Sequence, residues 1–541
     1  MRTPRFLTIA VLVVVLSALA GGLFASKAAP AQDDVDQQYR VFTAALSAIN
    51  RDYIEPVPSD HLVYGAIGGM LETLDPHSSF FDPKQYAQMR ERQEGHYYGI
   101  GLQILTINGD VTAMSVFEGS PAAKAGIRRG DIISKVEGQS AKNWTTEETA
   151  AKLKGPKGTK VNITITRPGY DKPIDLAVAR DEVHIVTVQG EFMLNPETGY
   201  IRLTDFSETS GQEVADSIER LKKQGMKQLV FDLRDNPGGA LDQAIVVANQ
   251  FLPKGDMIVY TRGRIQNVDE DYHATSDPNF TGPMMVLVNR NSASASEIVT
   301  GALQDHDRAL VVGETTFGKA LVQSVYRISE GAGLALTTGH YFTPSGRMIQ
   351  RPWDSSFDEY LTYTLRDQTG QQRQHLPSQL KYTDAGRKVY GGGGIEPDKF
   401  YDGATNGFNP TRFGRMLVAR SEFANFAERF AAQGDTRMNA ASAGKKRVAR
   451  GFTVDDAMVQ DFRSFLQSDK VKIDEDSFSK DLPFIKAMIH YEIDDALWGI
   501  GEAQKNLIGV DPQAQYAVSQ MPEAVKLREL SKSHAGSKGA N

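Results

Sequence analysis

Three serines lie close together where a short apolar run gives way to a helical pattern. The run from Met284 to Val288 has the length and composition of a buried strand, and the residues from Glu297 onward have helical spacing. Ser292, Ser294 and Ser296 are therefore expected in a strand-to-helix turn. The first N–H groups of a helix have no partner within it, so a serine there has donors beside it that could stabilise an oxyanion during acyl transfer.

A serine hydroxyl needs a base, and the next polar stretch of the chain, residues 313–323, supplies Lys319. Lysine acts as a base only when it is neutral. Lowering its pKa from about 10.4 to about 7 or 8 costs roughly 4 kcal/mol, which burial beside Phe317 and Leu321 could impose. A helix N-cap and a surface lysine would explain the same residues, and spacing alone does not choose among the three serines.

The sequence SASASE, followed by GETTFGKALVQ, resembles the nucleophile and base motifs of the C-terminal processing, or tail-specific, serine proteases. These enzymes use a Ser/Lys pair and no triad histidine. The resemblance implies that Ser294 is the nucleophile and that Lys319, 25 residues later, is the general base. It also implies that Gln323 orients the lysine. Ala320 departs from the family, which commonly has Gly there.

A glycine-rich turn follows another predicted strand, and from the residues alone an ordinary turn at the end of a strand is the simpler explanation of it. Residues 228–233 have the pattern of a buried strand and end in the sequence DLRDNPGG. Two glycines after a strand allow a close approach of the backbone, so an N–H there, together with the N–H of Ala295, could hold an oxyanion. The resemblance gives this role to the matching glycine, and we expect Gly239 rather than Gly238 to supply it.

Other chemistries fit the sequence less well. His306 or His340 could serve a Ser/His/Asp hydrolase, but no G-x-S-x-G sequence surrounds the serines. No His-x-x-x-His pair or carboxylate cluster indicates a metal, so no metal or other cofactor is expected. Glu297 is most simply explained as a first-turn acid that interacts favourably with the helix dipole.

Residues 91–182 differ from the rest of the chain in their short predicted strands and glycine-rich turns. The motifs GIGLQI, SPAAKAGI and GDII occur there in order and together resemble a PDZ domain. A glycine loop before a strand can hold the free carboxylate of a peptide on its backbone N–H groups, while the peptide adds as a strand. A packing module without an open groove is the alternative. The expected peptide-binding residues are Gly99, Ile100, Gly101 and Leu102.

The first residues have the pattern of an export signal. Arg2 and Arg5 precede an apolar run over residues 6–24, and Ala29-Pro30-Ala31 fits a cleavage site. As a helix the run would span about 28 Å, close to the roughly 30 Å of a bilayer core, so an uncleaved anchor is the alternative. We expect an exported protein, either periplasmic or membrane-anchored and facing the periplasm. The chain has no cysteine, so its cores must hold without disulfides.

A chain of 541 residues is too long for one hydrophobic core. Its net charge of −7 argues against a nucleic-acid partner. We predict a multidomain α/β protein with a mixed-sheet catalytic core of the tail-specific protease type, an inserted PDZ domain, and helical segments at both ends. The expected parts are a signal peptide or N-terminal anchor (1–31), an N-terminal helical segment (32–90), the PDZ domain (91–182), the serine protease core (183–405) and a C-terminal helical domain (406–541).

The expected function is that of an exported serine endopeptidase. It would bind substrate C-termini through its PDZ domain and hydrolyse peptide bonds, either to process or to degrade proteins. Its expected partners are proteins or peptides with free C-termini, and its N-terminus is a possible membrane contact. The alternative is a non-catalytic PDZ scaffold or adaptor on a protease-like core. The turn LDPHS, residues 74–78, also resembles a family feature, but a proline-fixed turn with an Asx cap explains it.

Overall fold

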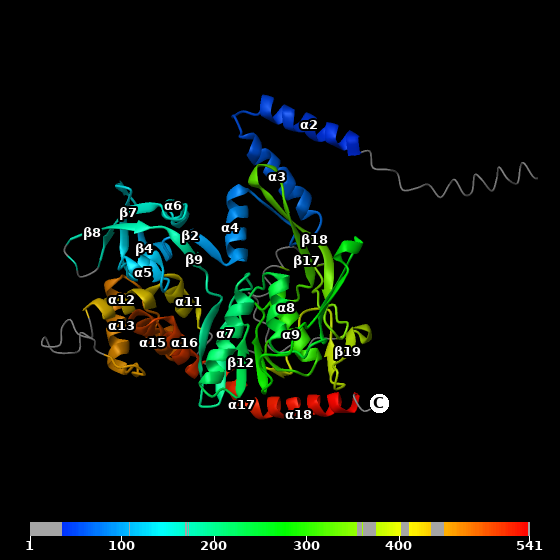
Figure 1. Cartoon of the computed structure of the whole chain (residues 1–541). Coiled ribbons are helices and arrows are strands. Elements are labelled where there is room, and N and C mark those ends of the chain that lie inside the picture. The colour runs from blue at the N-terminus through cyan, green and yellow to red at the C-terminus, as the bar shows by residue number, and fades with distance from the viewer. Residues whose placement is uncertain are drawn as a thin grey trace, which may run out of the picture. The chain divides into compact units, whose positions relative to one another are not determined.

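The computed structural model describes residues 35–107, 109–167, 170, 172–353, 360, 375–401, 410–433 and 448–538 (Figure 1). The expected export signal, residues 1–31, lies outside the described residues. The chain divides into two units, Met1–Leu74 and Asp75–Asn541. In the first unit, α2 (Val35–Asp52) has no buried residue and α3 (Ser59–Glu72) buries Leu71. Within the described ranges, no helix is long and apolar enough to cross a membrane.

A six-stranded sheet forms the centre of the second unit. Five of its strands are parallel, and only its first pair is antiparallel. The carboxyl ends of the parallel strands therefore lie along one edge, where the active residues of α/β sheets are usually found. In spatial order the strands are β10 (Val188–Met193), β11 (Thr198–Leu203), β12 (Gln228–Asp232), β15 (Met284–Val288), β16 (Leu310–Gly313) and β21 (Lys399–Phe400).

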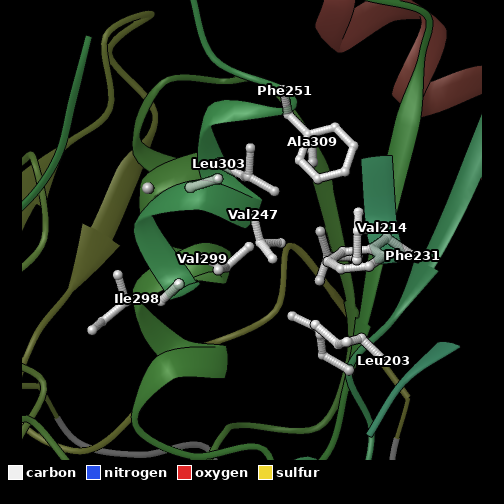
Figure 2. Close-up of a cluster of buried hydrophobic side chains, with 14 of the residues drawn as sticks. Leu203, Val214, Phe231, Val247, Phe251, Ile298, Val299, Leu303 and Ala309 are labelled. Atoms are coloured by element: carbon white, nitrogen blue, oxygen red, sulfur yellow. The ribbon is translucent and has the colours of Figure 1, made fainter. Parts of the chain in front are cut away.

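One face of this sheet packs against three helices. They are α7 (Ser210–Lys223), α8 (Leu241–Asn249) and α9 (Ala295–Asp305). Figure 2 shows side chains of the three helices meeting the strands, with Val214 of α7 beside Phe231 of β12, and Val247 of α8 beside Val299 of α9. All of these side chains are fully buried. Because successive strand side chains point to opposite faces, this core takes every second residue of each strand.

The other face of the sheet packs against the last helices of the chain. These are α16 (Ile500–Val510), α17 (Pro512–Ser519) and α18 (Met521–Lys538). The intervening strand residues Val230 and Met285 join Ile508, Ala514 and Met521 in a separate core. The sheet is therefore the middle of three layers, and the end of the chain supplies the third.

A second, antiparallel sheet lies beside the first and carries part of the site. It consists of β1 (Ser79–Phe81), β18 (Gly333–Phe342), β13 (Met257–Gly263) and β14 (Glu270–His273), and β17 (Leu321–Arg327) pairs with β18. Because β1 pairs with β18, and α4 (Pro83–Glu94) follows it, residues 75–94 belong to the second unit. The expected N-terminal helical segment, 32–90, is thus divided between the two units.

Residues 96–184 form the module that we expected to be a PDZ domain. Its sheet contains β3 (Leu102–Ile107), β4 (Asp110–Val116), β5 (Ile132–Val136), β7 (Lys160–Thr166) and β8 (Ile174–Ala179), with β6 (Gln139–Ser140) on β5. Two short helices, α5 (Pro121–Lys124) and α6 (Thr146–Leu153), accompany it. The module has a core of its own, and its two ends pair as β2 (His96–Gly99) and β9 (Asp181–His184).

The stretch that we expected to be one helical domain, 406–541, contributes to two cores. A bundle with a phenylalanine-rich core is formed by α11 (Arg412–Ala419), α12 (Glu422–Gln433), α13 (Asp456–Ser468), α14 (Glu475–Lys480) and α15 (Leu482–Trp498). The helices after Gly499 cover the central sheet instead, because their apolar faces match its second face. The multidomain α/β class with mixed sheets, predicted from the sequence, is confirmed.

Candidate active site

Ser294 lies at the junction of β15 and α9, where the chain turns sharply. Its backbone has φ +54° and ψ −114°. A non-glycine residue in such a sparsely populated conformation costs about 1–3 kcal/mol and is found mostly where function requires it. A sharp strand-to-helix turn of this kind presents a serine hydroxyl at the end of a sheet.

The three serines of this turn differ in what their hydroxyls do. Ser292 donates to the Leu233 carbonyl at 2.8 Å, and Ser296 donates to the Asn236 carbonyl at 2.9 Å. Both serines are fully buried, whereas Ser294 is half-buried. Two of the hydroxyls therefore join the turn to the residues after β12, and Ser294 is the serine of the three that reaches the surface.

Glu297 connects the serine turn to the loop that carries the lysine. Its carboxylate is fully buried and accepts four hydrogen bonds. One oxygen accepts from the Thr316 hydroxyl at 2.5 Å and the Gly318 N–H at 2.7 Å. The other accepts from the N–H groups of Ser294 and Lys319, both at 2.9 Å. Burial raises the pKa of Glu297 to about 7, although all four donors favour the charged form. One carboxylate oxygen thus holds the backbones of Ser294 and Lys319 together.

Tyr341 of β18 makes a second connection between the same two residues. Its buried hydroxyl lies 2.5 Å from the Lys319 carbonyl and 3.2 Å from the Ser294 carbonyl, and its hydrogen can be shared between them. Burial keeps the pKa of this phenol well above its usual value, so the group remains a donor. The two backbones are therefore held at their N–H groups by Glu297 and at their carbonyls by Tyr341.

The Lys319 side chain is partly buried and points toward Gln323. Its Nζ donates to the Gln323 Oε1 at 2.7 Å. Burial lowers the pKa of Lys319 below its ordinary value, and the negative charges of Glu297 and Asp75 partly oppose this effect. The lowered pKa increases the fraction of neutral amine, which is the form that can accept a proton.

The turn at residues 75–78 positions Gln323. The Gln323 Nε2 donates to the His77 carbonyl at 2.7 Å, which fixes the amide so that its oxygen faces Lys319. Asp75 accepts from the backbone N–H groups of His77 and Ser78 at 2.8 and 2.9 Å, as an Asx cap does. Burial, together with the charge of Lys319, lowers the pKa of His77 to about 4, so its ring is neutral near pH 7. The turn expected from the sequence is present, and it also contacts the lysine system.

The turn after β12 lies directly against the serine turn. A Cβ added to Gly238 would lie 2.7 Å from the Ala293 carbonyl oxygen and 2.8 Å from the Ala295 nitrogen, so only glycine fits. The Gly238 N–H donates to the Asn236 side chain at 2.9 Å. In the described part of the chain, neither the Gly239 N–H nor the Ala295 N–H donates to a protein acceptor. These two N–H groups are therefore available to an incoming oxygen.

The structure separates the two histidines of the alternative hydrolase from Ser294. His306 follows the last residue of α9, at the opposite end of the helix, and its ring contacts Asp384 at 2.8 Å. His340 precedes Tyr341 in β18, and neighbouring strand side chains point to opposite faces. Because Tyr341 reaches the Ser294 carbonyl, His340 points away from it. Neither ring is placed to activate Ser294.

The expected peptide-binding loop of the PDZ module lies between β2 and β3. Gly99 ends β2, Leu102 begins β3, and Ile100 and Gly101 form the turn. Gly101 has φ +83°, and Ile100 is buried in the core of the module. A Cβ on Gly99 would lie 2.8 Å from the ring of Tyr97, so this ring covers the start of the loop.

Sequence reasoning missed the contributions of Glu297, Tyr341 and His77. The spacing of Ser294 and Glu297 predicts a capping box, but three of the carboxylate's four donors come from a loop that follows β16. No motif in the sequence indicates a role for Tyr341. In the ranges that the structure describes, no group of three or more His, Asp or Glu side chains has the arrangement of a metal site.

Comparison with known families and proteins gives matches over most of the chain. A family model described as peptidase family S41 matches residues 197–353, and one described as a PDZ domain matches residues 112–167. A third, described as the activating protease CtpB N-terminal domain, matches residues 23–85.

Two relatives and one solved structure illustrate the similarity. The carboxy-terminal-processing protease of Bartonella bacilliformis is 40% identical over 319 residues, which are 58% of this chain and 73% of that protein. The carboxy-terminal processing protease CtpA of Bacillus subtilis is 38% identical over 317 residues, 58% of this chain and 67% of the relative. The photosystem II D1 C-terminal processing protease structure is 31% identical, with a TM-score of 0.32, and covers 56% of this chain and 88% of that one.

Proposed function

The chain belongs to peptidase family S41 and is a serine-type peptidase with a PDZ domain, and we propose that it is an exported endopeptidase with a Ser294/Lys319 dyad. In this proposal the PDZ domain binds the C-termini of protein substrates, and the protease core processes or degrades them. The observation that most directly supports the dyad is that one oxygen of Glu297 accepts hydrogen bonds from the backbone N–H groups of both Ser294 and Lys319.

The proposed mechanism begins with Lys319 in its neutral form. Lys319 accepts the proton of the Ser294 hydroxyl as that oxygen attacks the carbonyl carbon of the peptide bond. Lys319 then returns the proton to the amine leaving group, and a water molecule hydrolyses the acyl-enzyme by the same route. Gln323, which accepts a hydrogen bond from Nζ at 2.7 Å, keeps the amine directed within the site.

The negative charge that develops on the substrate oxygen needs preorganised donors. We assign this role to the N–H groups of Gly239 and Ala295. The Gly238 N–H already donates to Asn236, which supports the choice of Gly239. Ala295 is the first residue of α9, so its N–H also lies at the positive end of the helix dipole.

The PDZ module supports a preference for free C-termini. A loop formed by Gly99, Ile100, Gly101 and Leu102 before β3 has the position in which PDZ domains hold a terminal carboxylate, with the peptide added as a strand. The names of the two relatives refer to carboxy-terminal processing, which supports the same substrate class for this chain.

Export to the periplasm is proposed from the N-terminal sequence. The basic residues, the apolar run over residues 6–24 and the Ala29-Pro30-Ala31 step support a signal peptide or an anchor. Cell fractionation with determination of the mature N-terminus tests this proposal. Recovery of the full-length chain in the cytoplasm would contradict it.

Cleavage assays on an unfolded protein such as casein test the dyad. We expect Ser294→Ala and Lys319→Ala to abolish cleavage. Ser292→Ala and Ser296→Ala are matched controls in the same turn, and they should lower stability while leaving measurable cleavage, because their hydroxyls bind backbone carbonyls. Wild-type cleavage by Ser294→Ala or Lys319→Ala would overturn the dyad, whereas a wild-type protein that does not cleave would favour the non-catalytic scaffold.

Peptide binding tests the PDZ proposal separately. A peptide with a free C-terminus should bind the full-length Ser294→Ala protein more tightly than the same peptide with an amidated C-terminus, because the loop would capture the carboxylate. Equal affinities in a calorimetric titration would remove the carboxylate-capture idea and leave the dyad untouched.

A further inference from the structure

We propose that Asp511 and Gln513, at the start of α17, are positioning residues for the active site. They hold the ends of the three strands whose turns carry the reacting groups. This inference rests on the proposed function, since it concerns the same Ser294 and Lys319. It also gives a role to the final helices of the chain, beyond the range matched by the S41 family model.

The reacting groups follow three neighbouring parallel strands. Gly239 follows β12, Ser294 follows β15 and Lys319 follows β16. The three strands pair in register side by side. The relative placement of the three groups is therefore set by the ends of these strands, and a displacement of about 1 Å at such a position can cost on the order of 100-fold in rate.

Arg234 lies two residues beyond β12 and is almost entirely buried. Its guanidinium forms a forked contact with Asp232, with Nη2 donating to Oδ2 at 2.6 Å. Its remaining terminal nitrogen, Nη1, donates to the Asp511 carboxylate at 2.6 Å and to the Gln513 Oε1 at 3.1 Å. The Asp232 carboxylate also accepts from the buried Tyr200 hydroxyl at 2.6 Å. Two of the four partners in this buried network thus come from the start of α17 and the residue before it.

The residues on either side of Arg234 are those that hold the serine turn. Leu233, before it, accepts from the Ser292 hydroxyl at 2.8 Å. Asn236, two residues after it, accepts from the Ala293 N–H at 3.0 Å and from the Ser296 hydroxyl at 2.9 Å. A change in the position of Arg234 would therefore be transmitted to the backbone on both sides of Ser294.

Gln513 also contacts the ends of the other two strands. Its Nε2 donates to the carbonyl of Val288, the last residue of β15, at 3.3 Å. The same nitrogen lies 2.7 Å from the position of a Cβ on Gly313, the last residue of β16. The N–H of Glu314, at the start of the lysine loop, donates to the same Val288 carbonyl at 3.1 Å. One side chain therefore meets the carboxyl ends of β12, β15 and β16.

The start of α17 is held rigidly enough to act in this way. Asp511 caps the helix by accepting from the N–H groups of Gln513 and Ala514 at 2.9 and 3.2 Å through its Oδ1. Its other oxygen, Oδ2, faces Arg234. Ala514 and Ala517 are fully buried in the second core of the sheet. Capping and pairing use different oxygens of Asp511, so an isosteric variant can separate the two roles.

The test measures kcat and KM of full-length variants on the same casein substrate, below the temperature at which each variant begins to unfold. Asp511→Asn keeps the capping oxygen and removes the charge opposite Arg234. Gln513→Glu keeps the acceptor for Arg234 and replaces the donor to Val288 with a carboxylate oxygen. We expect each to lower kcat by about 10- to 100-fold with KM changed less than about twofold.

Gln515→Ala is the matched control. Gln515 lies on the same helix, is exposed, and donates only to the Ile508 carbonyl among the hydrogen bonds of its side chain. This variant should keep the wild-type kcat. A double variant, Asp511→Asn with Arg234→Lys, should lose no more activity than Arg234→Lys alone, because Asp511 acts through Arg234.

Values of kcat for Asp511→Asn and Gln513→Glu equal to that of Gln515→Ala would overturn the positioning role. Fully additive losses in the double variant would overturn its route through Arg234. If Gln513→Glu does not fold, Asp511→Asn decides the question, since its cap is intact. Wild-type cleavage by Ser294→Ala would instead overturn the proposed function, so the two failures are distinguishable.

Discussion

Replacing Glu297 with Gln should weaken both the fold and the active site. An amide can accept hydrogen bonds only at its oxygen, so two of the four donors around Glu297 lose their acceptor and face an NH2 group. A buried donor without an acceptor costs about 1–3 kcal/mol, so the free energy of unfolding should fall by about 2–6 kcal/mol. Because Ser294 and Lys319 share one oxygen of this carboxylate, we also expect kcat to fall by about 100-fold or more.

The same substitution should change the pH dependence of the remaining activity. In the proposed dyad Lys319 must be neutral to act, so kcat should rise as the pH increases through the pKa of Lys319. In the wild type, the charge of Glu297 raises this pKa against the effect of burial. Removing the charge lowers the pKa of Lys319 further, so the acidic limb of the profile of kcat against pH should move to lower pH.

Urea unfolding and steady-state cleavage between pH 5 and pH 10 measure these effects. Glu314→Gln is a suitable control, because Glu314 lies in the same loop but pairs with the Arg290 side chain at 2.7 Å, whereas Glu297 accepts from the N–H groups of Ser294 and Lys319. A Glu297→Gln protein with the wild-type unfolding midpoint, or with an acidic limb that moves to higher pH, would refute the reasoning.

Three further variants test other contacts. Gly238→Ala should lower kcat by about tenfold or more, because its Cβ would lie 2.7 Å from the Ala293 carbonyl oxygen. The control Gly255→Ala has a similar φ of +93° and no atom within 4 Å of the added Cβ, so it should keep the wild-type kcat. Equal values of kcat for the two variants would contradict the close-approach argument. Tyr341→Phe should lower the free energy of unfolding, measured in urea, by about 1–3 kcal/mol. It should also reduce kcat, since the Tyr341 hydroxyl contacts the carbonyls of both Ser294 and Lys319. An unchanged kcat would limit Tyr341 to a packing role. Burial raises the pKa of Glu428 from 4.5 to about 7 despite its pairing with Arg129. The folded state therefore binds the proton more tightly than the unfolded state, and stability should fall as the pH rises from about 4.5 to about 7. Thermal unfolding of Glu428→Gln should lack this part of the decline, and an equal dependence of stability on pH in both proteins would show that Glu428 is not its source.

The strands of the catalytic core could be predicted because each is buried on both faces. The runs over residues 228–233, 284–288 and 309–313 are almost continuously apolar, and they correspond to β12, β15 and β16. The family resemblance drawn from SASASE and GETTFGKALVQ is confirmed by the S41 match and by the two relatives. The departure at Ala320 is accommodated because its methyl group is fully buried in the main core.

The choice of serine could not be made from spacing, because it depends on residues elsewhere in the chain. Ser292 and Ser296 are satisfied by carbonyls of Leu233 and Asn236, which follow a different strand. Glu297 has the spacing of a capping residue, and its other partners come from the loop after β16. Long-range hydrogen bonds of this kind leave no local pattern in the sequence.

The surface against which the last helices pack could not be predicted from the sequence either. An amphipathic pattern shows that a helix has an apolar face, but it does not show which surface covers that face. Ile508 and Ala514 pack on the central sheet, whereas Phe462 and Ile485 of preceding helices pack within the bundle. Both groups carry similar apolar residues, so sequence reasoning treated them as one helical domain.

The second core of the central sheet has a consequence for biosynthesis. Val230, Met285 and Leu287 are translated long before Ile508 and Met521, which shield them in the finished protein. A nascent chain therefore exposes this apolar face of the sheet until helices α16 to α18 have been translated. A premature stop or a proteolytic nick before Ile508 would yield an aggregation-prone fragment, a target for chaperones and quality control, instead of a smaller working enzyme.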